Sequence, residues 1–575
     1  MRYFNEKITP VRGRFILLFC AQSINKLLYL RRKIYILIIF LSVLAFIESS
    51  IPYYYASNRC GNDKVFLGQI ISTFDQNMYF SFTRQARNGH ILFNNRLTYI
   101  SNPAVFFNLE FLGVGMLQRL TGMDENAVYS VWRFAGVVVL SISFVLLADL
   151  VLKDFLIVVL SSILFLFSGG IGFVRSFLNI AGLRNLFTGT GSIFGNSVPP
   201  NLAMDTSTYL LPINQEIANP HFSLPTGIFI LACYYYLRAL MQKQEKYFYY
   251  SLILFLVTGF VRPYDILPVL VIFPLFYLAT CKTRGFDKNF LLSMTPVWGV
   301  LLPFAYNIWL FRFNKIFSQW SVQGDNSYII PSFPVHLLNF GIMGLMLIIR
   351  LIWIKKQPLK VPEVFFLITV AVTLCINHIG KYSAIIPWSF QVGGYVAAPI
   401  VLLGFGFDYQ AISRKKIFRG IVFSGIMFLI LVSNLALVSF RCKLLSDPAN
   451  RTHMYASREE FDSWKWLQKN TKPGEVVLSS AYTCSRIAKY TDLSVVAGHP
   501  TVSPFYKATV EIAKKIVFDS TLPFRYRDEL KFLNVDYIYI GAEERLTNPG
   551  KIGNTDYLSE IYNNKGVSIY KIRKS

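Results

Sequence analysis

Apolar stretches long enough to cross a membrane recur along this chain from about residue 33 to about residue 438. A helix needs roughly 20 mostly apolar residues to span the hydrocarbon core of a bilayer. Only 15% of the residues are charged, whereas a soluble globular chain usually carries roughly 25%. Together these features predict an α-helical polytopic membrane protein with about eleven transmembrane helices.

The first span follows a basic leader and is expected to be retained. A cleaved signal peptide would have a shorter apolar core and a small-residue cleavage site. Among the later spans, 247–261 and 264–281 are separated only by Arg262-Pro263-Tyr264-Asp265. The alternative is that this pair forms one bent unit. The later spans are expected at 126–150, 155–175, 222–241, 247–261, 264–281, 288–311, 333–354, 362–378, 392–409 and 418–438.

The net charge is strongly positive, at +25 from 57 basic and 32 acidic residues. Nucleic-acid binding is one interpretation of such a charge. A membrane topology explains it better, because the basic residues gather in every second short loop, as the positive-inside rule requires of cytoplasmic loops. We therefore expect a multi-pass protein of the cell membrane, without a nucleic-acid partner. Its amino terminus is expected in the cytoplasm and its carboxy terminus outside.

Three long segments are expected on the outer side. The segment 53–125 contains an amphipathic surface helix, which we expect to be capped by Asn102 and stopped at Gly122. The segment 176–221 reads as a loop. The tail from about residue 439 reads as a small α/β unit that opens with a capping box from Ser457 to Glu460. A disulfide is allowed on this side, where three cysteines fall: Cys60, Cys442 and Cys484.

Asp75, early in the first outer segment, is the residue most suggestive of chemistry. A carboxylate at the outer membrane surface can act as a general base toward an acceptor hydroxyl. The alternative is structural, because Asp75 precedes a stretch that reads as a helix up to Gly89 and can serve as its N-cap. The two roles are compatible, since a cap also fixes the direction of the carboxylate.

Basic residues at the outer surface oppose the inside bias and suggest phosphate binding. Interfacial snorkelling is the alternative for each of them. The carboxylate of Asp265 lies in an apolar stretch, where it needs a partner; Arg262 would supply one in a structural ion pair. The basic residues are Arg84, Arg262, Arg312 and Lys381.

Asp205, Glu216 and His221 close the second outer segment and are weak candidates for a divalent metal site. Their spacing matches no known ligand pattern, and the alternative for His221 is to cap the next span. The sequence contains no Walker loop, no dinucleotide-binding fingerprint and no HExxH. An ATP-driven pump and a zinc protease are therefore unsupported.

Four stretches carry a family resemblance: DQNMYFSFTRQARNGHILF at 75–93, Glu216 followed by Pro220-His221-Phe222, AGHPTVSPFYKATVEIAKKI at 497–516, and LKFLNVDYIYIGAEE at 530–544. With the overall layout, they resemble the polytopic C-class (GT-C) glycosyltransferases, which include protein O-mannosyltransferases and aminoarabinose transferases. They look most like a group of prokaryotic membrane proteins of this class. The chain departs from the pattern at Arg262, where a His is expected. An acidic metal-binding pair like that of the oligosaccharyltransferases is not evident, which leaves metal dependence open.

The resemblance implies a transmembrane GT-C-like domain at 1–440 and an extracytoplasmic α/β domain at 441–575. It implies an inverting transfer of a sugar from a polyprenyl-phosphate donor to a glycan, lipid or protein acceptor. Asp75 would be the catalytic base. A divalent metal is the one cofactor left open, with Asp205 and Glu216 as its candidate ligands. The residues expected to bind substrate are Arg84, Glu216, His221, Arg262, Asp265 and Lys381.

Other classes of function remain open from the residues alone. A transporter or lipid flippase would place charged residues deep within its spans, whereas the charges noted here lie mainly at the outer ends. A polysaccharide polymerase or ligase also has large outer loops. A receptor or assembly factor would use the tail to bind a partner.

Overall fold

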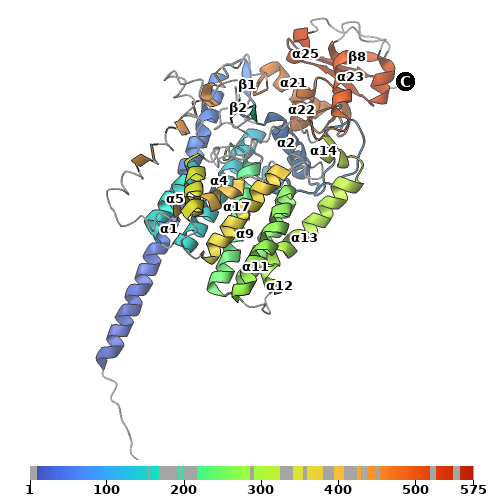
Figure 1. The fold of residues 1–575 in the computed structure, drawn as a ribbon. Coiled ribbons are helices and arrows are strands. Elements are labelled where there is room, and N and C mark those ends of the chain that lie inside the picture. Colours follow the sequence, from blue (N-terminus) through green and yellow to red (C-terminus); the bar gives the residue numbers. More distant parts are fainter. Residues whose placement is uncertain are drawn as a thin grey trace, which may run out of the picture.

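The computed structural model describes residues 10–70, 72–152, 154–167, 192–193, 196–197, 217–284, 290–323, 341–353, 359–379, 394–406, 453–518, 526–547 and 557–573, with scattered positions between 424 and 448. It shows a bundle of helices with a mixed sheet at one end (Figure 1). The helices of the bundle are α1 Pro10–Arg59, α4 Glu125–Leu152, α5 Phe155–Phe167, α9 Pro220–Gln242, α10 Lys246–Val261, α11 Ile266–Arg284, α12 Phe290–Ser293, α13 Thr295–Ile308, α16 Gly341–Trp353, α17 Val361–Ile379 and α18 Ala397–Val401.

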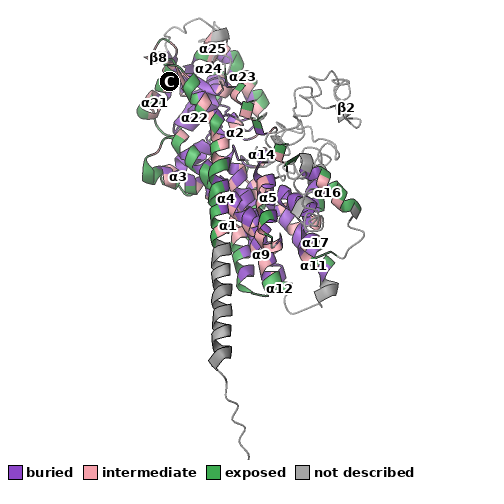
Figure 2. Cartoon of the chain, turned by 90° about the vertical axis from the view of Figure 1, so that its left-hand side faces the viewer, coloured by how far each residue is buried: buried purple, intermediate pink, exposed green. Residues whose placement is uncertain are grey.

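Within the described residues, four segments are long and apolar enough to cross a membrane. The prediction of a helical protein with apolar spans is confirmed to this extent, and the number of about eleven spans stays a prediction. On the part of α1 that Figure 2 colours by burial, exposed residues dominate the outward face, and the side chains of Tyr35, Ile36, Ile39 and Phe40 are each at least 57% exposed. Large apolar side chains without protein contacts are what a lipid environment accommodates. The four segments are Arg32–Arg59, Glu125–Leu152, Pro220–Gln242 and Pro263–Thr280.

Small residues bring α4 and α9 into close contact in the centre of the bundle. A Cβ atom added at Gly227 would lie 2.8 Å from the backbone nitrogen of Leu140, and one at Gly136 would lie 2.4 Å from the hydroxyl of Ser223. Small residues at such crossings let helix backbones approach one another. This contact fixes the start of α9, which carries His221.

The break that the sequence places after residue 261 is a short turn between two helices. Helix α10 ends at Val261, Arg262 is extended, and a 3₁₀ turn, η2, covers Pro263–Asp265 before α11 begins. Proline supplies no backbone donor and so does not continue the helix ladder. The break places the charged side chains of Arg262 and Asp265 at the end of the bundle, where both are fully buried.

Residues 60–124, which join α1 to α4 and are called the connecting segment below, contain β1 Lys64–Phe66, α2 Thr73–Arg87 and α3 Leu109–Thr121. The amphipathic helix of the sequence analysis is α3, but it begins later than expected. Asn108 caps it by accepting hydrogen bonds from two backbone amides, whereas the side chain of Asn102 is bonded within the preceding loop. The predicted stop at Gly122 is correct, with φ at 69°.

Residues 453–573, called the C-terminal region, contain a five-stranded sheet in the order β6-β5-β7-β9-β8. Strand β5 pairs in parallel with β6 and β7, and β9 pairs antiparallel with β7 and β8. The predicted capping box at Ser457 is confirmed. The helix α22 was not foreseen. The elements are β4 Tyr455–Ser457, α21 Arg458–Asn470, β5 Val476–Leu478, α22 Ala481–Tyr490, β6 Ser494–Val495, α23 Tyr506–Phe518, α24 Arg527–Phe532, β7 Tyr537–Ile540, α25 Ala542–Thr547, β8 Leu558–Asn563 and β9 Ser568–Ile572.

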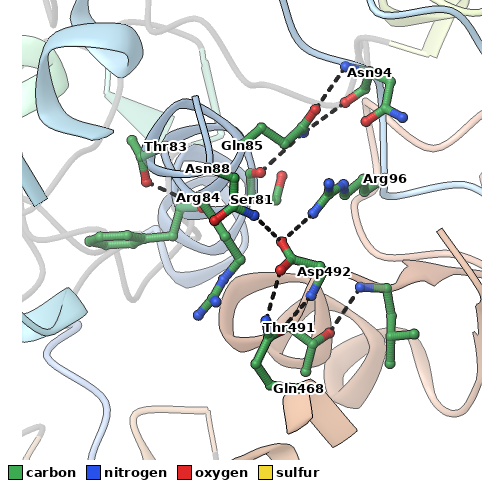
Figure 3. A network of polar contacts seen from close by, with 12 residues as sticks. Ser81, Thr83, Arg84, Gln85, Asn88, Asn94, Arg96, Gln468, Thr491 and Asp492 are labelled. Atoms are coloured by element: carbon green, nitrogen blue, oxygen red, sulfur yellow. Dashed lines mark hydrogen bonds and ion pairs between the residues drawn. The ribbon is translucent and has the colours of Figure 1, made fainter. Parts of the chain in front are cut away.

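The C-terminal region is anchored to the connecting segment by strand pairing and by a polar network. Strand β1 pairs antiparallel with β4. Figure 3 shows Asn88, Arg96 and Gln468 converging on the carboxylate of Asp492. The ion pair from Arg96 to Asp492 measures 2.7 Å and is almost fully buried. Buried, fully bonded polar groups specify one arrangement of the parts they join, so the two regions form a fixed junction.

Candidate active site between the connecting segment and the C-terminal region

Asp75 lies in the first turn of α2, at this junction. The helix begins at Thr73 after Ser72, so Asp75 is its third residue and the N-cap interpretation is wrong. Its side chain is 42% exposed. A carboxylate in the first turn interacts favourably with the positive end of the helix dipole, so the helix accommodates Asp75 at this accessible position.

His499 of the C-terminal region contacts this carboxylate. Its Nε2 lies 3.0 Å from Oδ1 of Asp75, and its own side chain is only 5% exposed. The other carboxylate oxygen, Oδ2, has no hydrogen-bond partner among the residues that the structure describes. The sequence analysis missed His499 as a site residue, although it lies inside the stretch at 497–516 that carries the family resemblance.

Aromatic side chains hold the start of α2 against α22. The ring of Phe74 lies 4.5 Å from that of Tyr482 and 6.2 Å from the imidazole of His499, centroid to centroid. The hydroxyls of Tyr482 and Thr73 are hydrogen-bonded to each other. The Asp75–His499 contact is therefore placed by packing on both sides and not by the two side chains alone.

A second acid–histidine pair is buried in the bundle. The carboxylate of Glu110 lies 2.6 Å from Nδ1 of His221 through one oxygen and accepts a hydrogen bond of 2.8 Å from Trp132 Nε1 through the other. The Glu110 side chain has no exposed surface. His221 is the second residue of α9, where its backbone amide is capped by Asn219. A buried carboxylate needs partners of this kind to offset the cost of its desolvation.

Tyr79, on the face of α2 below Asp75, connects the two pairs. Its ring lies 4.6 Å from the imidazole of His221. Burial raises the pKa of Tyr79 well above its usual value, and the negative charges of Asp75 and Glu110 raise it further. The phenol is therefore neutral. Because Asp75 and Glu110 both raise the pKa of Tyr79, the Asp75–His499 pair and the Glu110–His221 pair are electrostatically linked through this phenol.

The arginines expected to bind phosphate are engaged in contacts within the protein. Arg262 is fully buried, with its Nε 2.7 Å from Asp265 and another nitrogen 3.2 Å from the hydroxyl of Thr226. Arg84 is also buried and pairs with Glu125 at 2.9 Å. The structural alternative given for Arg262 and Asp265 matches this geometry. Arg312 is exposed in the π-helical turn Trp309–Phe313, which follows α13.

Three expected site residues, Asp205, Glu216 and Lys381, lie outside the described residues, so neither the metal expectation nor the lysine can be placed. Within the described ranges, no group of three or more His, Cys, Asp or Glu side chains is arranged to hold a metal. The cysteines Cys60, Cys442 and Cys484 are free thiols in the structure.

No protein-family model matches the chain. No curated protein matches it either. The solved structures that resemble it include the Archaeoglobus fulgidus oligosaccharyltransferase in its apo form, at 14% identity and a TM-score of 0.47, covering 88% of this chain and 70% of that one. The same enzyme tethered to an acceptor peptide with the NVT sequon gives 12% identity, a TM-score of 0.46 and coverages of 93% and 74%. AglB from Archaeoglobus fulgidus, in complex with an inhibitory peptide and a dolichol-phosphate, matches at 13% identity and a TM-score of 0.42, covering 88% of this chain and 69% of that one. All three are structures of an archaeal oligosaccharyltransferase.

Proposed function

We propose that this chain is an extracytoplasmic glycosyltransferase that moves a sugar from a polyprenyl-phosphate donor to an acceptor hydroxyl. The observation that supports it most is the position of Asp75: an accessible carboxylate in a helix first turn, at a junction beside a membrane-spanning bundle. Nucleotide sugars are absent outside the cytoplasm, so a donor there would carry its sugar on a lipid phosphate held in the bilayer.

In the proposed reaction, Oδ2 of Asp75 takes the proton of the acceptor hydroxyl. The oxygen of that hydroxyl forms a bond to the anomeric carbon while the bond from this carbon to the lipid phosphate oxygen breaks. The phosphate leaves with the electron pair, and the configuration at the anomeric carbon is inverted. Cations stabilise the departing phosphate. Lys381 and Arg312 are the remaining candidates for this role, because Arg84 and Arg262 are paired with acids of the protein.

The topology is part of the proposal. About eleven spans, with a cytoplasmic amino terminus, would place the connecting segment and the C-terminal region outside. A reporter fused after Ser575 is then expected to be active only on the outer side. A cytoplasmic signal from that reporter would contradict the placement of Asp75.

The direct test is sugar transfer in proteoliposomes that contain the full chain and a labelled polyprenyl-phosphate sugar. Asp75→Asn is expected to abolish transfer while leaving expression and membrane insertion unchanged, because the amide keeps the shape of the side chain but cannot accept the proton. Asp63→Asn is the matched control, since Asp63 is an exposed acid of the same segment. Full activity of Asp75→Asn would overturn the proposal.

A further inference from the structure

We propose that His499 is a positioning residue for Asp75, so that the C-terminal region supplies part of the active site. The inference rests on the proposed function and adds to it a role for the C-terminal region. It follows from the hydrogen bonds on the two ring nitrogens of His499 and from the way its loop is held.

The contacts of His499 specify one tautomer. The backbone N–H of Thr501 points at Nδ1 from 3.1 Å, and the Thr501 hydroxyl lies 3.0 Å from the same nitrogen. Because an amide N–H can only donate, Nδ1 must be the accepting nitrogen and carries no proton. The proton of the neutral ring is then on Nε2, which donates to Oδ1 of Asp75 at 3.0 Å.

The loop that carries His499 is held by the connecting segment. Residues Gly498 and His499 both donate their backbone N–H to the hydroxyl of Ser503, at 3.0 and 2.9 Å. That hydroxyl in turn donates to the backbone oxygen of Leu97 at 2.5 Å. Ser503 is fully buried. These bonds fix the position and orientation of the imidazole before any substrate binds.

Close packing adds to this arrangement. A Cβ atom added at Gly498 would lie 2.6 Å from a methyl carbon of Leu97. The backbone of Ala497 forms an antiparallel bridge with Thr98. The connecting segment therefore contacts the loop of His499 through residues 95–98 and carries Asp75 on α2. The same segment thus positions both the histidine and the carboxylate.

The chemical consequence concerns which oxygen of Asp75 accepts the proton. A donor fixed on Oδ1 leaves Oδ2 to face the acceptor hydroxyl, in the way that a second residue orients a catalytic base in other hydrolase and transferase sites. In this role the histidine donates a hydrogen bond and transfers no proton. Removing it would leave a carboxylate that rotates, with a loss expected in the chemical step more than in binding.

The test compares three variants of the full chain in the proteoliposome assay. His499→Ala is expected to lower kcat by about 10- to 100-fold with little change in KM. His499→Gln is expected to restore part of this activity, because an amide N–H can donate to Oδ1. His90→Ala is the control, since His90 is an exposed histidine of the connecting segment.

The pH profile separates positioning from a merely structural role. Loss of a hydrogen bond to the charged carboxylate is expected to move the acidic limb of kcat/KM upward by about one pH unit in His499→Ala. Within the described residues, the charge of Asp75 also interacts with the phenols of Tyr79 and Tyr264, and the raised pKa of Tyr79 keeps that phenol neutral across this range. The melting temperature in detergent is measured for each variant.

Two outcomes would overturn the inference: normal kcat in His499→Ala, or an equal loss in both His499 variants with an unmoved acidic limb. Asp75→Asn, measured in parallel, distinguishes the two proposals. An inactive Asp75→Asn beside a normal His499→Ala would reject only the positioning role. An active Asp75→Asn would reject the proposed function itself.

Discussion

Glu110 and His221 meet in the interior of the bundle with 2.6 Å between Oε2 of the carboxylate and Nδ1 of the ring. Because the second oxygen of Glu110 accepts from Trp132, the carboxylate joins α3, α4 and α9 through hydrogen bonds. Changes at Glu110 therefore test how much this shared contact stabilises the packing of the three helices.

Glu110→Gln is expected to destabilise the protein by about 1–3 kcal/mol. A glutamine offers one acceptor and one donor where the carboxylate offers two acceptors, so one of the two contacts is lost or must change its proton arrangement. Thermal unfolding in detergent is the measurement. Glu245→Gln is the control, since Glu245 is exposed before α10 and makes no side-chain capping bond. Equal melting temperatures for the two variants would contradict the importance of this contact.

Arg262 and Asp265 form a buried ion pair whose role can be decided by a double-mutant cycle. Removing one partner leaves the other charge buried and uncompensated, which costs about 3–5 kcal/mol. We expect Arg262→Leu and Asp265→Leu each to destabilise the chain strongly, and the double variant to lose less than their sum. If Arg262 instead binds donor phosphate, its substitution would raise KM for the donor while the melting temperature stays unchanged.

The crossing of α2 and α3 depends on Gly115. A Cβ atom added there would lie 2.3 Å from the backbone oxygen of Thr83 and 2.4 Å from Cβ of Ala86. Gly115→Ala is therefore expected to push the helices apart and to destabilise by about 1–3 kcal/mol. Gly113→Ala is a matched control on the same helix, because an added Cβ there meets nothing within 4 Å. That control gains the helix preference of alanine, and its melting temperature is expected to stay equal or rise.

What the sequence predicts well in this fold is local. The capping box at Ser457 and the stop at Gly122 depend on neighbours within one turn, and both are confirmed. The start of α3 was placed wrongly because Asn102 and Asn108 both precede apolar residues. Only the hydrogen bonds of the folded loop, which occupy the side chain of Asn102, decide between them.

The site depends on contacts between residues far apart in the sequence. Asp75 and His499 are separated by 424 positions, and Glu110 and His221 by 111. No spacing rule connects such pairs, so Asp75 was identified from its position after the first span, while His499 and Glu110 were missed. The charge of Arg262 near the outer surface predicts phosphate binding, but in the structure this residue is buried and paired with Asp265.

Lys489 gives the junction a pH dependence that can be measured. Lys489 lies on α22, and its amine is buried against the connecting segment, where it donates to the backbone oxygen of Leu67 at 2.8 Å. Burial lowers the pKa of Lys489 to about 7, although the charges of Glu125 and Asp124 act in the opposite direction. In the unfolded chain the amine keeps its ordinary pKa of about 10.4.

Between these two values the unfolded chain binds more protons than the folded one, so stability rises with pH across this window. Below pH 7 both states are protonated and the cost of burying the charge is present in full. We expect the melting temperature in detergent to rise from pH 7 to pH 9, by the equivalent of about 2 kcal/mol relative to Lys489→Met. The methionine variant keeps the length of the side chain without a titrating group, so the difference between the two curves isolates this amine. Parallel curves for the two proteins would contradict this prediction, because they would show that Lys489 stays protonated in the folded chain across this range, as an amine that reaches water does.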